Sequence, residues 1–248
     1  MAVSVDTVYQ KVLALANKEQ RGYITPQEFN LFADHAQKEI FEQYFYDLNQ
    51  FRRIPGNDTE YSDMVKNLEE KISLFEVYGH EVLDNGYGLV DLTNDISNLY
   101  RIGEVRVIYL GKGFSTAEEA QIKDLDIYSN KGLTGATIKR PRYTRYNKEG
   151  VSTLHLYPNS GSGNTEATID KVRISYIKKP AKPQWGYVVI NNKPLYNVSS
   201  SIGFDLHPSE ESELVYRILA LAGVAIEKPQ LTQIAGNATA SQIQQEKQ

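Results

Sequence analysis

A metal-binding pattern over residues 17–28 is the first chemistry that the spacing of this chain suggests. Gly22 and Glu28 stand at the sixth and twelfth positions of an EF-hand calcium loop, which needs a turn and then a bidentate carboxylate there. The fifth position is Arg21, a cation where calcium needs an oxygen ligand. A plainer interpretation is that Thr25 caps a helix and Glu28 completes a capping box. The segment is therefore predicted to start a helix and not to bind calcium.

Other reactive side chains are too scattered to form a catalytic or metal-binding set. The histidines include no pair at i and i+4, and the serines include no G-x-S-x-G turn. Residues 111–116 (GKGFST) hold the letters of a phosphate loop in the wrong order, because the lysine is not followed directly by Ser or Thr. The four histidines are His35, His80, His155 and His207. These observations predict a protein that is not an enzyme and that uses no cofactor and no metal ion.

One basic cluster could bind a partner. Cations neutralise phosphate groups and tyrosines between them can stack on bases, which makes the cluster a candidate DNA-facing surface. The alternative is a hairpin whose polar face is basic, a device that keeps an edge strand from pairing wrongly. The sequence leaves both interpretations open. The cluster comprises Lys139, Arg140, Arg142, Arg145 and Lys148, interleaved with Tyr143 and Tyr146.

Length and composition set the class of protein. A chain of 248 residues can bury about 70–75% of its unfolded surface, which is enough for a real core. No apolar run approaches the ~20 residues that span a bilayer, so no membrane contact is expected. The N-terminal residues lack a basic segment followed by an apolar stretch, and there is no cysteine, which together predict synthesis in a cytoplasm. A net charge of −4 argues against a free-standing nucleic-acid binder.

Hydrophobic spacing predicts helices at both ends of the chain. Apolar residues recur every three or four positions in four segments, which is the period of one helix face. The second segment has a strongly aromatic face, and the last begins at Pro208 with acidic residues at its positive end. The four segments are residues 4–16, 29–51, 60–75 and 208–228.

The middle of the chain, residues 101–207, has the composition of a β-rich module. Residues 105–109 alternate in a strand-like way, and residues 143–157 predict a hairpin whose Gly150 supplies a positive φ. Residues 116–128 are expected to interrupt the strands as a short polar helix. The module is therefore predicted to be antiparallel and to contain one helical interruption.

An α+β fold follows from this order of elements. Because both terminal helical regions have an apolar face, the economical arrangement is a helical bundle built from both chain ends with the β module inserted between them. Residues 229–248 contain six glutamines and no aromatic residue, which predicts a flexible tail that becomes ordered on a partner. The expected parts are a helical part (1–100), the β module (101–207), a closing helix (208–228) on the first helices, and the docking tail (229–248).

Four short stretches carry a resemblance to a known family. They are residues 20–30 (QRGYITPQEFN), 154–158 (LHLYP), 172–180 (VRISYIKKP) and 204–208 (FDLHP), which together span most of the chain. The first resembles the N-terminal region of phage virion structural proteins, the next two resemble their strand motifs, and the last resembles their closing element. The chain is thus similar to the head-to-tail connector proteins of tailed bacteriophages, the adaptor or tail-tubular-A-like group.

What the resemblance implies is a structural protein of the virion neck or tail, assembled in the host cytoplasm. Such a protein forms a ring with copies of itself, commonly twelve, between the portal protein and a downstream tail or nozzle protein. DNA passes through the centre of the ring, and whether the ring also contacts this DNA non-specifically is left open. Mapped on this chain, the docking tail offers Pro229, Leu231, Ile234 and Ile243 as candidate contacts. The helical part is longer than in minimal adaptors, which leaves the station in the virion open.

A second hypothesis gives the β module a different task. The chain is then a virion accessory or tail protein that binds a receptor or glycan. Trp185 and surface tyrosines serve as the stacking platforms in this interpretation.

Overall fold

The computed structural model describes two compact units of the chain. Unit 1 joins Met1–Leu74 to Pro180–Gln248, and unit 2 is the continuous segment Phe75–Lys179. Helices and antiparallel strands both contribute, so the mixed α+β class is confirmed. The described residues are 3–16, 24–53, 59–124, 135–159 and 167–225, together with 233, 236–238, 240 and 241.

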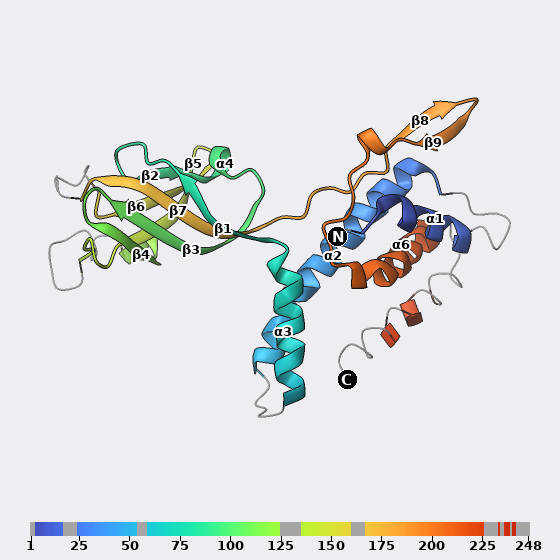
Figure 1. The fold of residues 1–248 in the computed structure, drawn as a ribbon, viewed down its shortest axis with the longest axis horizontal. Helices are drawn as coiled ribbons and strands as arrows, with labels where there is room; N and C mark the ends of the chain where they lie inside the picture. Colours follow the sequence, from blue (N-terminus) through green and yellow to red (C-terminus); the bar gives the residue numbers. More distant parts are fainter. Residues whose placement is uncertain are drawn as a thin grey trace. The chain divides into compact units, whose positions relative to one another are not determined.

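Unit 1 is built largely from helices that come from both ends of the chain (Figure 1). They are α1 (Val5–Ala16), α2 (Pro26–Arg53), α3 (Thr59–Ser73) and α6 (Glu211–Ala225), with the 3-10 turn η6 (Pro208–Glu210) before α6. Helix α6 contacts α1 and α2, and α2 also contacts α3. On α2 the apolar stripe that the sequence predicted is largely buried from Phe29 to Tyr44, with Phe29 and Ile40 at most 1% exposed, and is half-buried at Leu48 and Phe51. Within the described segments, every helix is too short or too polar to cross a bilayer.

The start of α2 confirms the capping box. The Thr25 backbone N–H donates to Glu28 Oε2 over 2.9 Å, and the Glu28 N–H donates to Thr25 Oγ1 over 3.3 Å. Two backbone donors that have no partner inside the helix are thereby satisfied. The hydrogen bond from the Thr25 backbone lowers the pKa of Glu28, because it favours the ionised carboxylate. Glu28 is therefore a helix-start residue.

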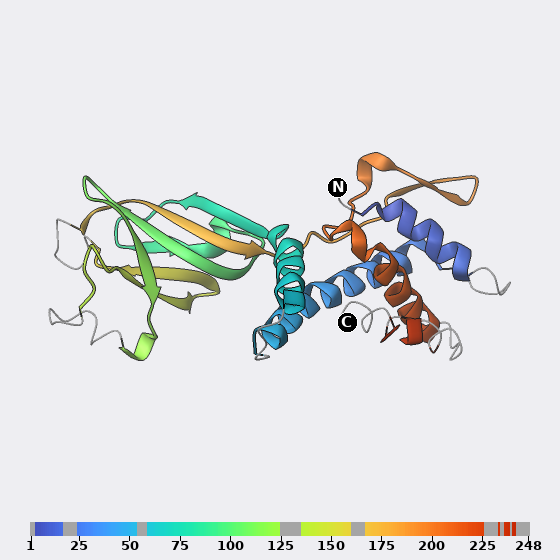
Figure 2. The same cartoon turned by 60° about the horizontal axis from the view of Figure 1, so that its bottom comes forward.

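Unit 2 is a seven-stranded sheet that curls back on itself (Figure 2). Its order is β1-β7-β3-β4-β5-β6-β2, and neighbours are antiparallel except for the parallel pair β4 and β5. Val105, Val107 and Tyr109 alternate toward the inner face, where each is at most 1% exposed. The strands are β1 (Glu76–Val82), β2 (Leu89–Asp91), β3 (Leu99–Tyr109), β4 (Gly113–Glu119), β5 (Arg142–Lys148), β6 (Val151–Tyr157) and β7 (Ile169–Lys178), and the short helix α4 (Leu92–Asp95) follows β2.

The hairpin expected over residues 143–157 is confirmed as β5 and β6. Its register pairs Lys148 with Val151, so Glu149 and Gly150 form the turn. Both turn residues have a positive φ, 54° and 88°. This is the backbone that a two-residue turn needs to match the twist of the strands, and glycine adopts it at little cost.

Two expectations about the middle of the chain are wrong. Strand β1 begins at Glu76, so the β region starts well before residue 101. The segment expected as a helix over 116–128 begins instead in β4, which ends at Glu119, and a 3-10 turn follows at Ile122–Asp124. Pairing with β3 overrides the weak helical spacing, because Ala117 lies opposite Val105 and is buried in the core. Residues 125–128 lie outside the described residues.

Residues 180–207 also differ from the expected organisation. They belong to unit 1 and not to the seven-stranded sheet. Within them, β8 (Tyr187–Ile190) and β9 (Lys193–Tyr196) form a separate two-stranded sheet, and the 3-10 turn η5 (Val198–Ser200) follows. The β module therefore ends near Lys179, and the chain returns to unit 1 for these strands and for α6.

Candidate interaction surfaces

Strands β8 and β9 form a hairpin in unit 1 (Figure 1). Apolar side chains are exposed on both faces of this hairpin. Val188 and Val189 are neighbours in a strand and so point to opposite faces, yet they are 49% and 60% exposed. Asn191 and Asn192 form the turn with φ values of 52° and 59°, which asparagine tolerates better than most residues. Among the described residues, neither face of the hairpin tip has a cover. Further exposed apolar residues in and beside it are Ile190, Leu195, Tyr196, Val198 and Ile202.

The base of the hairpin is fixed to the helices of unit 1 through Trp185. This side chain is buried, and its ring centroid lies 4.5 Å from that of Tyr9 on α1. Its indole N–H donates to the Asp6 carboxylate over 2.9 Å, and its backbone N–H donates to Asn30 Oδ1 over 2.7 Å. The ring also stacks on Tyr187 at the start of β8. The hairpin tip is therefore presented from a rigid base.

Trp185 is consequently unsuitable as a glycan-stacking platform, and that expectation is wrong. Its indole N–H already donates to Asp6 and its ring already packs against Tyr9, both inside unit 1, and the residue is 3% exposed. It also lies outside the seven-stranded sheet of unit 2. Its role is to pack the hairpin onto α1 and α2.

Strand β5 places residues of the predicted basic cluster on two opposite faces of the sheet. Side chains alternate along β5, so Arg142 and Lys148 point to the outer face of the sheet. Tyr143 and Arg145 point to the opposite face. Tyr143 is buried in the core of unit 2, and this burial raises its pKa. Tyr143 therefore cannot stack on bases, and the five cations do not form a single face. Lys139 and Arg140 are exposed in the turn before β5.

A row of rings lies on the outer face of β5 and β6, beside the two outer cations. The rings of His155 and Tyr157 are 4.3 Å apart, and that of Tyr146 is 6.4 Å from His155. Tyr157 Oη lies 2.6 Å from His155 Nδ1, and the Asn159 amide nitrogen lies 3.3 Å from Nε2. Burial lowers the pKa of His155, so the ring is neutral near pH 7. The outer face thus offers Arg142, Lys148 and three half-buried rings.

Sequence reasoning missed His155 and Tyr157 as part of this surface. His155 and Tyr157 are two residues apart in β6, which is the spacing of side chains on one face of a strand. Opposite them, Thr144 pairs with His155 and Arg142 pairs with Tyr157. Applying the strand period to both arms of the predicted hairpin would have placed these side chains together.

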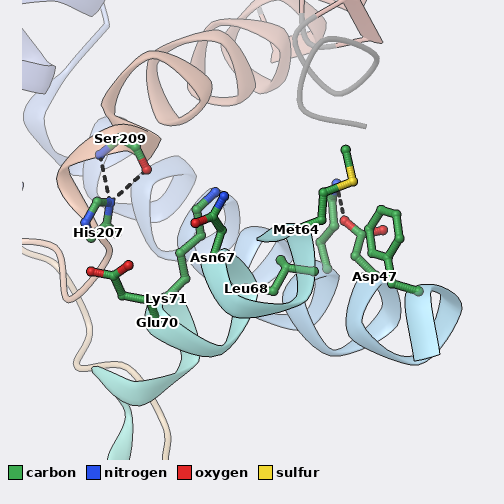
Figure 3. A pocket seen from close by; sticks show the side chains of 10 residues that line it. Asp47, Met64, Asn67, Leu68, Glu70, Lys71, His207 and Ser209 are labelled. Atoms are coloured by element: carbon green, nitrogen blue, oxygen red, sulfur yellow. Dashed lines mark hydrogen bonds between the residues drawn. The ribbon is translucent and has the colours of Figure 1, made fainter. Parts of the chain in front are cut away.

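A pocket of about 360 Å³ lies within unit 1 (Figure 3). Met64 and Asp47 are at one end of it, and His207 and Ser209 are at the other. His207 Nδ1 accepts from the Ser209 backbone N–H over 3.3 Å, which makes the histidine the cap of η6. The residues that line the pocket come from α2, α3 and the η6 region: Gln43, Asp47, Phe51, Met64, Asn67, Leu68, Glu70, Lys71, His207 and Ser209.

Buried charges beside this pocket connect three elements. Lys71 of α3 forms an ion pair with Glu210 of η6 over 2.5 Å, and the Glu210 side chain is 1% exposed. Arg217 of α6 donates to Glu213 over 2.7 Å and also bonds Gln43 of α2. Burial raises the pKa of Glu213 to about 7, and Arg217 opposes this effect. These polar contacts fix the start of α6 against α2 and α3.

The predicted docking residues Pro229, Leu231, Ile234 and Ile243 lie outside the described residues. Comparison with known proteins returned no matching protein-family model and no matching curated protein.

Proposed function

We propose that this chain is a non-enzymatic structural protein of a tailed-phage virion. In this proposal it forms a ring that joins the portal protein to a downstream tail or nozzle protein and surrounds the DNA channel of the neck. The β8–β9 hairpin carries the proposal. Exposed apolar patches of this kind mark surfaces that bind other proteins.

The size and chemistry of the hairpin favour a protein partner. Five of the eight residues in its two strands are apolar and 37–60% exposed, and exposed apolar residues this close together are typical of protein-binding surfaces. These residues are Val188, Val189, Ile190, Leu195 and Tyr196. Lys193 is the one charged residue in its two strands. The rigid base at Trp185 means that little conformational entropy is lost when the tip docks.

Other parts of the chain fit the same proposal. Contacts of α6 with α1 and α2 agree with a helical bundle closed by both chain ends, with unit 2 inserted. Residues 229–248 are proposed as the tail that docks on the portal, with contacts from Pro229, Leu231, Ile234 and Ile243. Deletion of residues 229–248 is expected to abolish portal binding, and a truncated chain that still binds the portal contradicts this docking role. Lys139, Arg140, Arg142 and Lys148 are the proposed DNA-facing cations, because Arg145 lies on the opposite face of β5, and their replacement by serine is expected to weaken retention on DNA at low salt.

Native mass spectrometry of the intact chain, alone and mixed with its portal, tests ring formation. The wild-type chain is expected to form assemblies of ten or more copies, at least with the portal present. Val189→Asp places a charge on the docking surface and is expected to reduce the assembly to monomers, because the charge loses water on docking without gaining a partner. Leu31→Asp on α2 is the matched control, since Leu31 is 63% exposed and lies outside the hairpin. A wild-type chain that is monomeric under both conditions contradicts the proposal.

The ring row on the outer face of β5 and β6 favours one second candidate, a glycan or receptor surface of a virion accessory protein. Tyr146, His155 and Tyr157 are half-buried rings on one face, and Arg142 pairs with Tyr157 across the strands, a combination that also suits a polar ligand. Tyr146→Ala is expected to abolish binding on a glycan array under this reading. An array on which the wild-type chain shows no signal removes it.

A further inference from the structure

A second exposed surface lies on the outer face of unit 2, on strands β1, β3 and β4. It is called here the Arg106 face and consists of Tyr78, Arg106, Ile108 and Phe114. Tyr78 and Phe114 are 73% and 69% exposed, although each is a large aromatic residue. The opposite face of the same strands holds the core of the unit. The sheet therefore does not need these outward rings for its own packing.

Arg106 is held in place between the two rings. Its Nη1 donates to Tyr78 Oη over 2.6 Å, and its Nη2 lies 2.8 Å from the Glu104 carboxylate. Its guanidinium carbon lies 5.4 Å from the ring centroid of Tyr78 and 5.8 Å from that of Phe114. Thr116 Oγ1 donates to the same Glu104 over 3.0 Å. A surface fixed in this way loses little side-chain entropy on binding.

The composition of the Arg106 face is that of a protein-binding hot spot. Tyrosine, arginine and phenylalanine are enriched at the centres of protein interfaces, where a few such residues supply most of the binding energy. The surrounding charges are already paired within the sheet, since Glu81 bonds both Lys171 and Arg173. An apolar partner can therefore cover the face without leaving a new unpaired charge.

A ring requires two different surfaces on each copy. A surface that binds its own equivalent closes a dimer by two-fold symmetry, whereas a ring needs a head-to-tail contact in which one patch meets another. The β8–β9 hairpin supplies one patch. The Arg106 face has the properties of the other: it is exposed, aromatic, rigid and balanced in charge, and the hairpin that would meet it is apolar with Lys193 as its one charge.

We infer that the β8–β9 hairpin of one copy docks on the Arg106 face of the next copy. This inference rests on the proposed ring. The junction would bring exposed apolar residues of the hairpin against Tyr78 and Phe114, so its centre is apolar and aromatic, as the centres of protein interfaces are. Repetition of the same junction around the ring joins each copy to two neighbours.

A mixing experiment with two defective chains tests the junction. The Val189→Asp chain keeps an intact Arg106 face, and the Phe114→Asp chain keeps an intact hairpin. Each chain alone is expected to be monomeric by native mass spectrometry. An equimolar mixture, with one chain isotope-labelled, is expected to give a dimer of one copy of each and nothing larger, because one intact junction remains. Both substitutions replace exposed side chains, and unchanged circular dichroism verifies that the chains are folded.

The outcomes separate this inference from the proposed ring. If Phe114→Asp alone assembles as the wild type does, the hairpin docks elsewhere and the inference is overturned while the ring stands. The same holds if the wild type forms rings and the mixture yields no mixed dimer. A wild-type chain that never assembles overturns both.

A disulfide trap gives an independent readout. Because the chain contains no cysteine, a bond between Val189→Cys and Phe114→Cys chains has one interpretation. Mixed under mild oxidation, these two chains are expected to form a heterodimeric disulfide at least tenfold faster than Val189→Cys mixed with the control Leu31→Cys. Equal rates for the two mixtures contradict the inference.

Discussion

Glu213 has an environment that opposes its ionisation. Its side chain is buried at the start of α6, where the nearby Glu210 carboxylate adds repulsion and Arg217 compensates in part. Burial is the largest cause, and it raises the pKa from the ordinary 4.5 to about 7. The folded chain therefore holds this proton more tightly than the unfolded chain does. The contribution of Glu213 to stability is complete below pH 4.5 and is lost as the pH rises through about 7.

Glu213→Gln is expected to flatten the pH dependence of stability. Glutamine resembles the protonated acid and does not ionise, so the loss of stability between pH 4.5 and 8 is expected to shrink by about 2–3 kcal/mol relative to wild type. Urea denaturation at a series of pH values measures this difference. Glu42→Gln on an exposed part of α2 is the matched control. Parallel pH profiles for wild type and Glu213→Gln contradict the assignment.

Contacts at residue scale were predictable where they are local. Thr25 and Glu28 are three residues apart, so the spacing alone indicates their capping box. Trp185 and Asp6 are separated by most of the chain, and their hydrogen bond depends on how the strand connection returns to α1. No rule of sequence spacing predicts a contact between residues so far apart, which is why Trp185 was interpreted as an exposed aromatic side chain.

Strand β4 shows at element scale where periodicity misleads. Ala117 and Ala120 are three residues apart, as on a helix, but in the structure residues 113–117 pair with β3 and residues 118 and 119 pair with β5. Pairing of β4 with β3 supplies a full ladder of backbone hydrogen bonds, and Ala117 enters the core. The sequence of one segment contains no information about that neighbour. The β5–β6 hairpin was predictable because its partner strands adjoin.

Ala117→Asp tests the strand assignment of this segment. An unpaired carboxylate in the core is expected to cost about 3 kcal/mol or more, whereas Glu118→Asp, one position along and facing outward, is expected to change stability by less than about 0.5 kcal/mol. Thermal unfolding of the two variants measures the contrast. Similar losses at both positions contradict the alternation of a strand.

At the scale of the whole molecule, unit 2 is inserted into unit 1. The chain enters the sheet at Phe75 and leaves at Lys179, and the Lys178 N–H donates to the Phe75 carbonyl over 2.8 Å. Entry and exit are therefore neighbours, which is the usual geometry of an inserted domain. The sequence predicted an insertion but placed its start at residue 101, because the turn-rich stretch before β3 hides two short strands.

Unit 2 is expected to fold when residues 75–179 are produced alone. The sixteen described residues of its buried cluster all lie between Val82 and Tyr176, so the excised segment keeps the whole of this cluster. Its ¹H–¹⁵N correlation spectrum is expected to be well dispersed and to overlay on the matching peaks of the whole chain. Because entry and exit adjoin, a short Gly-Ser linker can replace the unit between Leu74 and Pro180. The linked variant keeps the hairpin but lacks the Arg106 face, so it is expected to stay monomeric alone and to bind the Val189→Asp chain one to one. A collapsed spectrum for the excised unit contradicts its independence, since the segment retains every described residue of the buried cluster.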